Sequence, residues 1–177
     1  MKILIVIDML KDFLDKDGAL YCGDKAREII PFVKRKIDEF HKNDDPVIFL
    51  CDSHSEDDLE FKLFPKHCIS GTRGSELISE LSFDTKEDIL VPKHRYNGFY
   101  MTILADILKQ FDIKQKGIES IEVVGVCTSI CVLFTIEELR NRDYNVVVYN
   151  DGVADFDLEA QEYSLKMMKK ILGVKIV

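Results

Sequence analysis

Short apolar runs alternate along this chain with longer stretches in which apolar residues recur every three or four positions. Six of the short runs lack the strict apolar–polar alternation of a half-exposed strand. Runs of this kind are typical of strands that are buried on both faces, as in parallel sheets. They predict strands over residues 2–7, 47–51, 89–91, 121–126, 145–149 and 174–177.

The stretches between these runs have helical periodicity. Residues 25–42 place apolar side chains on one face and charged side chains opposite, which is the pattern of an amphipathic helix. The other predicted helices cover residues 102–111, 130–140 and 158–172, with a shorter one over 74–81. Because strands and helices alternate, we expect one α/β domain over residues 1–177. Its architecture would be a three-layer α/β/α sandwich with a mainly parallel six-stranded sheet.

Residues that can carry chemistry follow four of the predicted strands. Asp8 comes after the first strand, Asp52 after the second, Lys93 after the third, and Cys131 a few residues beyond the fourth. The sites of open parallel sheets form beyond the carboxyl ends of the strands. We therefore expect these four side chains to converge at one edge of the sheet.

Cys131 is the candidate nucleophile. A compact turn of small residues follows the strand at 121–126, so Cys131 falls in the first turn of the next helix. The partial positive charge of a helix N-terminus can lower the pKa of a thiol and favour the reactive thiolate. The alternative is that Cys131 is a small buried apolar residue, as many free cysteines are.

Asp8 and Lys93 would support a reactive thiol. A carboxylate at the end of an apolar strand is costly unless it is paired, and Asp8 could act as the general base for Cys131. A lysine close to both groups would stay charged, favour the thiolate and hold the carboxylate in place. Taken singly, Asp8 is also compatible with a turn residue, and Lys93 with a solvated loop lysine.

The long loop over residues 52–73 carries a second candidate site. Asp52, His54, Glu60 and His67 offer two imidazoles and two carboxylates. This donor set suits Zn²⁺ or another divalent first-row metal, such as Mn²⁺ or Fe²⁺. The alternative is a solvated acidic loop with two incidental histidines. Long loops in compact domains are usually functional, which favours the metal site.

Composition and charge restrict the partners. The chain has ordinary globular composition and a formal net charge of −8, which argues against a nucleic acid or an anionic membrane surface as partner. Asp8 interrupts the N-terminal apolar run too early for a signal peptide, and no run approaches the length of a membrane span. Five cysteines without the dense spacing of a disulfide scaffold indicate a reducing cytoplasm.

Four motifs follow one another along nearly the whole chain. They are D-x-x-x-D-F at residues 8–13, D-x-H at 52–54 with P-K-H-C-x-x-G-T-x-G at 65–74, K-x-x-Y-x-x-F at 93–99, and G-V-C-T-S-I-C-V at 125–132. In this order they resemble the isochorismatase-like cysteine hydrolases, and within them the nicotinamidases, also called pyrazinamidases.

This resemblance implies a catalytic triad of Asp8, Lys93 and Cys131, with Cys131 rather than Cys127 as the nucleophile. It also implies a cis peptide bond between Val126 and Cys127. That bond would direct the backbone N–H of Cys127, together with that of Cys131, at a substrate oxygen. The two N–H groups would form an oxyanion hole.

The resemblance also carries over Asp52, His54 and His67 as metal ligands. Many family members have a third histidine where this chain has Glu60, and some nicotinamidases have a glutamate there. The non-metal branches of the superfamily lack the Asp-x-His…His set. Its presence therefore favours nicotinamidase over isochorismatase or carbamoyl amidase.

The activity that the resemblance implies is hydrolysis of nicotinamide, and of pyrazinamide, to the acid and ammonia through a cysteine thioester, as part of NAD salvage. Phe13, Phe64 and Tyr100 would wall the pocket, with Phe64 where a tryptophan is usual. The family also suggests homo-oligomers. One alternative is an isochorismatase-like amidase or hydrolase with another substrate. A less favoured one is a redox or ligand-binding protein that uses Cys127 and Cys131.

Overall fold

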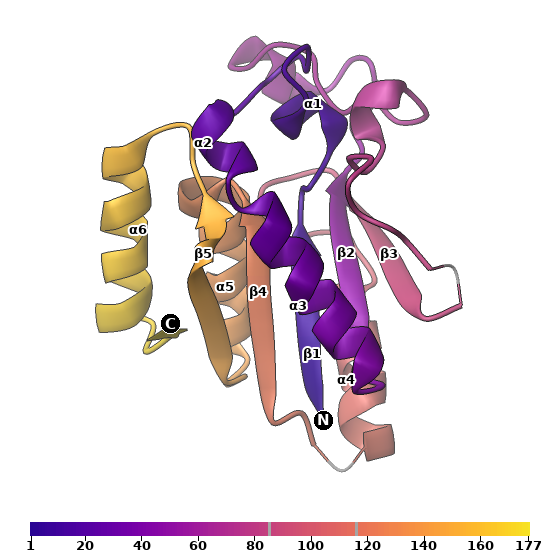
Figure 1. Ribbon diagram of the computed structural model, residues 1–177, viewed down its shortest axis with the longest axis vertical. Helices are drawn as coiled ribbons and strands as arrows, with labels where there is room; N and C mark the ends of the chain where they lie inside the picture. The colour runs from indigo at the N-terminus through magenta and orange to yellow at the C-terminus, as the bar shows by residue number, and fades with distance from the viewer. Residues whose placement is uncertain (85, 116) are drawn as a thin grey trace.

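The computed structural model describes residues 1–84, 86–115 and 117–177. Within these residues six strands form one sheet in the order β3-β2-β1-β4-β5-β6, and each neighbouring pair is parallel. The strands are β1 (Lys2–Ile7), β2 (Val47–Asp52), β3 (Asp88–Lys93), β4 (Ser120–Val126), β5 (Val146–Ala154) and β6 (Lys175–Ile176). The predicted parallel six-stranded α/β sheet is confirmed (Figure 1).

Helices cover both faces of the sheet, as the three-layer prediction requires. α2 (Asp24–Arg27) and α3 (Ile30–Lys42) lie on the face turned to the viewer in Figure 1. The opposite face is covered by α4 (Leu104–Gln115), α5 (Leu133–Asn141) and α6 (Leu158–Lys170). Each layer of helices buries its own cluster of apolar side chains against the sheet.

The side chains of β1 show why its apolar run is continuous. Leu4 and Val6 point into the cluster beneath α3, whereas Ile3, Ile5 and Ile7 point into the cluster beneath α4, α5 and α6. Successive side chains of a strand face opposite sides, so a central strand between two helix layers needs an apolar residue at every position.

The predicted helix over residues 25–42 is wrong in one respect, because it divides into α2 and α3. Pro31 lies in the first turn of α3. A proline is tolerated there because its missing N–H would have no partner in the helix. Farther inside a helix, its ring would clash with the carbonyl four residues earlier. The break before Pro31 removes that clash.

The predicted helix over residues 74–81 is also wrong. This segment has a 3₁₀ turn, η2 (Arg73–Ser75), at its start and a further turn at residues 79–80, and between the two turns it lies beside the segment that follows β1. Leu77 forms an antiparallel bridge with Leu10, and the N–H of Ile78 donates to the carbonyl of Met9 at 3.1 Å. The backbone groups of this segment therefore find partners far away in sequence.

Two short elements were not predicted. They are α1 (Lys11–Leu14) and the 3₁₀ turn η1 (Leu59–Lys62), and each covers about one turn, too little for a periodicity to show. The carboxyl ends of the strands and the loops that carry these turns lie at the top of Figure 1.

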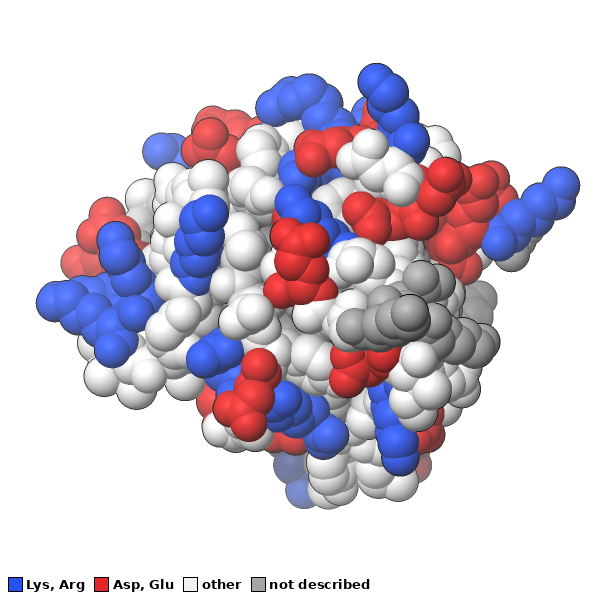
Figure 2. All heavy atoms as spheres, turned by 90° about the horizontal axis from the view of Figure 1, so that it is seen from below, with Lys and Arg blue, Asp and Glu red and all other residues white. Residues whose placement is uncertain are grey.

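Figure 2 shows the opposite end of the molecule, at the amino ends of the strands, where acidic and basic side chains are interspersed. Among the described residues, no helix combines the length and apolar character needed to cross a membrane.

Candidate active site

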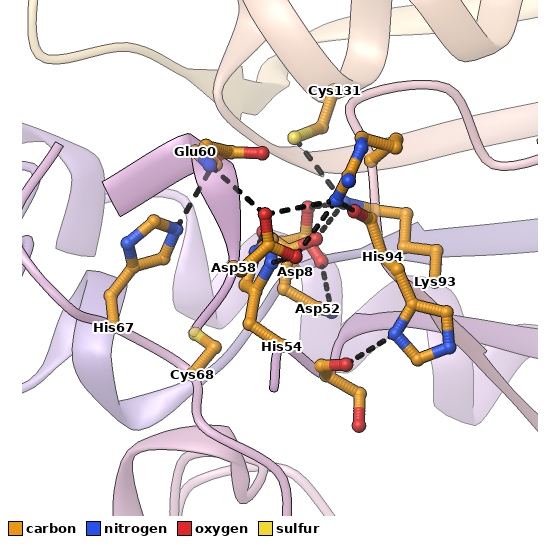
Figure 3. A network of polar contacts seen from close by, with 12 residues as sticks. Asp8, Asp52, His54, Asp58, Glu60, His67, Cys68, Lys93, His94 and Cys131 are labelled. Carbon is orange, nitrogen blue, oxygen red and sulfur yellow. Dashed lines mark hydrogen bonds and ion pairs between the residues drawn. The ribbon is translucent and has the colours of Figure 1, made fainter. Parts of the chain in front are cut away.

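The expected convergence of Asp8, Lys93 and Cys131 is present at the carboxyl ends of the strands (Figure 3). Asp8 follows β1, Lys93 is the last residue of β3, and Cys131 lies in the π-helical turn η3 (Thr128–Val132) between β4 and α5. Lys93 Nζ lies 2.8 Å from Asp8 Oδ2 and 3.4 Å from Cys131 Sγ. All three residues are buried.

Hydrogen bonds hold Asp8 in a fixed orientation. Its backbone has a φ of 51°, a left-handed conformation that aspartate tolerates better than most residues. Its N–H donates to the carbonyl of Leu50 at 2.9 Å, and its Oδ1 accepts the N–H of Asp52 at 2.9 Å. Oδ2 forms an ion pair with the Lys93 ammonium. The angles of this contact are not those of a hydrogen bond, and Oδ2 accepts no other hydrogen bond from the described residues. Oδ2 is thus the oxygen available to a proton.

Burial controls the pKa values of this group. Burial and the nearby Asp52 carboxylate raise the pKa of Asp8 to about 6. Burial opposes the charge of Lys93, but the Asp52 and Asp8 carboxylates raise its pKa well above the usual value. Asp52 lies 2.5 Å from Lys93 Nζ, on the neighbouring strand. Lys93 is therefore a permanent cation between two carboxylates.

The predicted lowering of the Cys131 pKa is wrong. Burial, reinforced by the Asp8 and Asp52 carboxylates, raises the pKa of this thiol well above its usual value, although Lys93 acts in the opposite direction. Desolvation outweighs the partial charge of a helix N-terminus because the thiolate would lie in a low-dielectric interior. Cys131 is therefore a thiol in the free protein, and a base close to its sulfur is needed to remove the proton.

The backbone around the nucleophile turn is closely packed. The peptide bond between Val126 and Cys127 is cis, as expected from the resemblance. Gly125 has a φ of +125°, and a Cβ built on it would lie 2.0 Å from the carbonyl oxygen of Ile7. Glycine at this position lets the end of β4 lie against β1 at the point where Asp8 leaves it.

Asp155 supports the same turn and was missed in the sequence. Its buried carboxylate accepts the N–H of Ser129 at 2.7 Å. Asp155 directly follows β5, so the rule that indicated Asp8 and Asp52 applies to it as well. The predicted strand ended at residue 149, five residues before the observed end of β5, and this error hid the signal.

The five cysteines, all within the described residues, are free thiols. Cys127 Sγ lies 3.4 Å from Cys22 Sγ. The thiol of Cys127 thus contacts Cys22, a residue that the sequence analysis did not single out.

The candidate metal ligands also lie together. One ligand atom each of Asp52, His54 and His67 falls within 4.8 Å of the others. His67 Nε2 lies 3.8 Å from Glu60 Oε1, which brings the fourth candidate to the same place. His54 Nε2 and Glu60 Oε2 are buried and have no hydrogen-bond partner among the described residues. Two buried atoms that can bind a metal but have no hydrogen-bond partner, within a set of nitrogen and oxygen ligands, fit a divalent metal ion.

Hydrogen bonds at Nδ1 orient the imidazole rings of His54 and His67. His67 Nδ1 lies 2.7 Å from the carbonyl oxygen of Pro65, and His54 Nδ1 lies 3.1 Å from Asp58 Oδ2. Both partners can only accept, so each Nδ1 carries the proton and each Nε2 is left for a metal. Asp58 was not predicted; its position four residues after His54 in the same loop was the available signal.

Aromatic rings surround His67. The centroids of Phe13 and Phe64 lie 5.5 and 6.4 Å from its ring, so both predicted wall residues are beside the metal set. Phe61, which was not predicted, contacts the rings of both His54 and His67. Tyr100 lies farther out and lines a cleft of about 420 Å³ that His54 also lines.

Known proteins share this arrangement of elements. A model of the Isochorismatase domain matches residues 2–176. Nicotinamidase 1 of Arabidopsis thaliana is 38% identical to the chain, over 88% of this chain and 70% of that protein. The crystal structure of nicotinamidase PncA from Bacillus subtilis superposes with a TM-score of 0.89 at 34% identity, covering 99% of this chain and 98% of the other.

A second similar structure holds a metal. Pyrazinamidase of Pyrococcus horikoshii in complex with zinc superposes with a TM-score of 0.89 at 29% identity, over 99% of this chain and 98% of that chain. The match of the family model spans nearly every residue, including all of the candidate site described above. This chain therefore belongs to the isochorismatase family.

Proposed function

We propose that this isochorismatase-family hydrolase is a nicotinamidase, which converts nicotinamide, and also pyrazinamide, to the acid and ammonia. The observation that carries the proposal is the contact of Lys93 Nζ with both Asp8 and Cys131 Sγ, beside a set of metal ligands. The nicotinamidases and the pyrazinamidase among its relatives support the same substrate class.

The reaction begins with proton transfer from Cys131 Sγ to Asp8 Oδ2. With a pKa of about 6, Asp8 is mostly ionised at neutral pH and yet is a stronger base than an ordinary aspartate. The Lys93 ammonium, 3.4 Å from the sulfur, stabilises the thiolate as it forms. The thiolate attacks the carboxamide carbon, and the backbone N–H groups of Cys127 and Cys131 receive the oxyanion.

Asp8 then acts as the general acid. It returns its proton to the departing nitrogen, because an amide ion is too basic to leave unprotonated. Water hydrolyses the resulting thioester, releasing the carboxylic acid and restoring the Cys131 thiol. Phe13 and Phe64 hold the substrate ring and exclude bulk water during these steps.

Asp52, His54, Glu60 and His67 would hold the divalent metal, for which Zn²⁺ is our first choice and Mn²⁺ or Fe²⁺ are the alternatives. When bound, this ion supplies a coordination position for the ring nitrogen of the substrate. Together, the aromatic wall and this position select a pyridine or pyrazine carboxamide. The activity would serve NAD salvage in the cytoplasm, in a homo-oligomer.

Ammonia release from nicotinamide tests the proposal. We expect turnover by the wild-type protein and none by Cys131→Ala, with an unchanged circular dichroism spectrum showing that the variant is folded. A fully active Cys131→Ala variant would refute the assignment of the nucleophile. Benzamide, which lacks the ring nitrogen, should react poorly. Turnover of other amides without turnover of nicotinamide would favour a different amidase of the family.

A further inference from the structure

We infer that Asp58 is a positioning residue for the metal site: its carboxylate holds the His54 ring with Nε2 free for the metal. Arg95 in turn holds Asp58. The inference rests on the metal site of the proposed function. It concerns residues that neither the motifs nor the comparisons single out.

The Asp58 carboxylate makes two hydrogen bonds within the metal loop. Its side chain is only 5% exposed. Oδ2 lies 3.1 Å from His54 Nδ1, and Oδ1 accepts the backbone N–H of Glu60 at 2.9 Å. One carboxylate thus contacts two of the four candidate ligand residues.

The bond to His54 decides which ring nitrogen can bind a metal. A carboxylate is only an acceptor, so Nδ1 carries the proton and the lone pair of the neutral ring lies on Nε2. His54 Nε2 is buried, lies 3.7 Å from Asp52 Oδ2, and has no hydrogen-bond partner among the described residues. The fixed tautomer therefore presents the free nitrogen to the other ligands.

Arg95 fixes the carboxylate from a different segment. Its Nη1 lies 2.8 Å from Asp58 Oδ2 and 3.0 Å from Oδ1. The Arg95 side chain is 42% exposed, so this ion pair contributes orientation more than stability. Because Arg95 follows Lys93 by two residues, the pair also ties the metal loop to the end of the strand that carries the lysine.

A second role of Asp58 must be separated from the first. Its carboxylate also caps the 3₁₀ turn η1, which carries Glu60. Serine can supply the same cap, but its side chain is too short to reach His54. Asparagine keeps the size and shape of aspartate but offers only one acceptor oxygen. All three partners of Asp58 are donors, so the amide NH₂ group must face one of them.

The experiment measures the dissociation constant of Zn²⁺ by competition with a fluorescent chelator. We compare the wild type, Asp58→Asn, Asp58→Ser and the control Asp57→Asn, which changes the exposed neighbouring carboxylate. We expect both Asp58 variants to bind zinc about 10–100-fold more weakly, as is typical for loss of the partner of a ligating histidine. Asp57→Asn should bind as the wild type does.

A second readout reports the tautomer directly. Long-range ¹H–¹⁵N NMR of the zinc-loaded wild type should show the His54 proton on Nδ1, and this signal should be lost or broadened in Asp58→Asn. Thermal unfolding of the zinc-free variants shows whether each is folded. Asp58→Asn keeps the test decisive even where Asp58→Ser does not fold.

Wild-type zinc affinity in Asp58→Asn would overturn the inference, and so would a wild-type protein that does not bind zinc. Ammonia release from nicotinamide is measured on the same samples. Zinc binding that depends on Asp58, in a protein that releases no ammonia, would refute the proposed substrate and leave the inference standing.

Discussion

Asp8 combines properties that an exposed aspartate cannot have. It is fully buried, and its pKa of about 6 results from burial and Asp52 on one side and Lys93 on the other. A carboxylate with this pKa can accept a proton at neutral pH and return it within the same catalytic cycle. The raised pKa of Cys131 makes such a base necessary.

The variant Asp8→Asn isolates this proton transfer. Asparagine can still accept the N–H of Asp52 through its carbonyl oxygen, but it cannot take the thiol proton. We expect kcat/KM for nicotinamide to fall by about 10²–10⁴-fold, measured as ammonia release, because this is the usual contribution of a general base. Asp17→Asn, at an exposed position, should leave the rate unchanged. Near-normal turnover by Asp8→Asn would show that another group is the general base.

At the scale of elements, the site depends on how closely two strand ends approach. β4 ends against β1 only because Gly125 has no side chain at a φ of +125°, where a Cβ would lie 2.0 Å from the carbonyl oxygen of Ile7. The turn that carries Cys131 starts two residues after β4 ends. The strand contact therefore fixes where the nucleophile turn begins.

Replacing Gly125 tests this contact. Gly125→Ala adds both backbone strain and a clash with the backbone of Ile7, so we expect the free energy of unfolding to fall by about 2–5 kcal/mol in urea titrations. Gly23→Ala is a matched control, because Gly23 has a φ of +93° with no atom within 4 Å of the added Cβ. It should cost about 1–3 kcal/mol, the strain alone, because φ 93° with ψ 165° is a backbone conformation open essentially to glycine. Equal losses in the two variants would contradict the argument.

The elements also show how far sequence patterns reach. The strands were predicted well because a strand buried on both faces must be apolar throughout, and this is a local signal. The helix predicted over 74–81 failed because Leu77 and Ile78 bond to the segment around Leu10, which no local window reveals. The end of β5 was missed because the strand continues through Asn150, Asp151 and Gly152, which interrupt its apolar run.

At the scale of the whole molecule, a buried ion cluster joins one helix layer to the sheet. Lys36 of α3 lies 2.9 Å from Glu122 of β4, and Tyr149 of β5 donates a hydrogen bond to the same carboxylate at 2.6 Å. Burial works against the charge of Glu122, but the bonds from Tyr149 and Lys36 hold its pKa below the usual value. The cluster thus couples three elements electrostatically.

This cluster predicts a pH-dependent stability. A lowered pKa in the folded state adds stability that is present above the unfolded value of about 4.3 and is lost as pH falls through the folded value. Glu122→Gln should lower the free energy of unfolding at pH 7 by about 1–3 kcal/mol. The difference in free energy of unfolding between Glu122→Gln and the wild type should shrink below about pH 4, where Glu122 itself becomes protonated. Urea unfolding at several pH values measures it, with the exposed Glu162→Gln as control. A difference that does not depend on pH would contradict this account.

The sequence by itself determined the parallel sheet, the strand ends that carry Asp8, Asp52 and Lys93, and the chemical types of the candidate ligands. These follow from local periodicity and from the rule that places sites at the carboxyl ends of strands. Only the tertiary structure decided the direction of the Cys131 pKa, the bond between Asp58 and His54, and the role of Arg95. Desolvation and long-range hydrogen bonds set these features, and both depend on atoms brought together from distant parts of the chain.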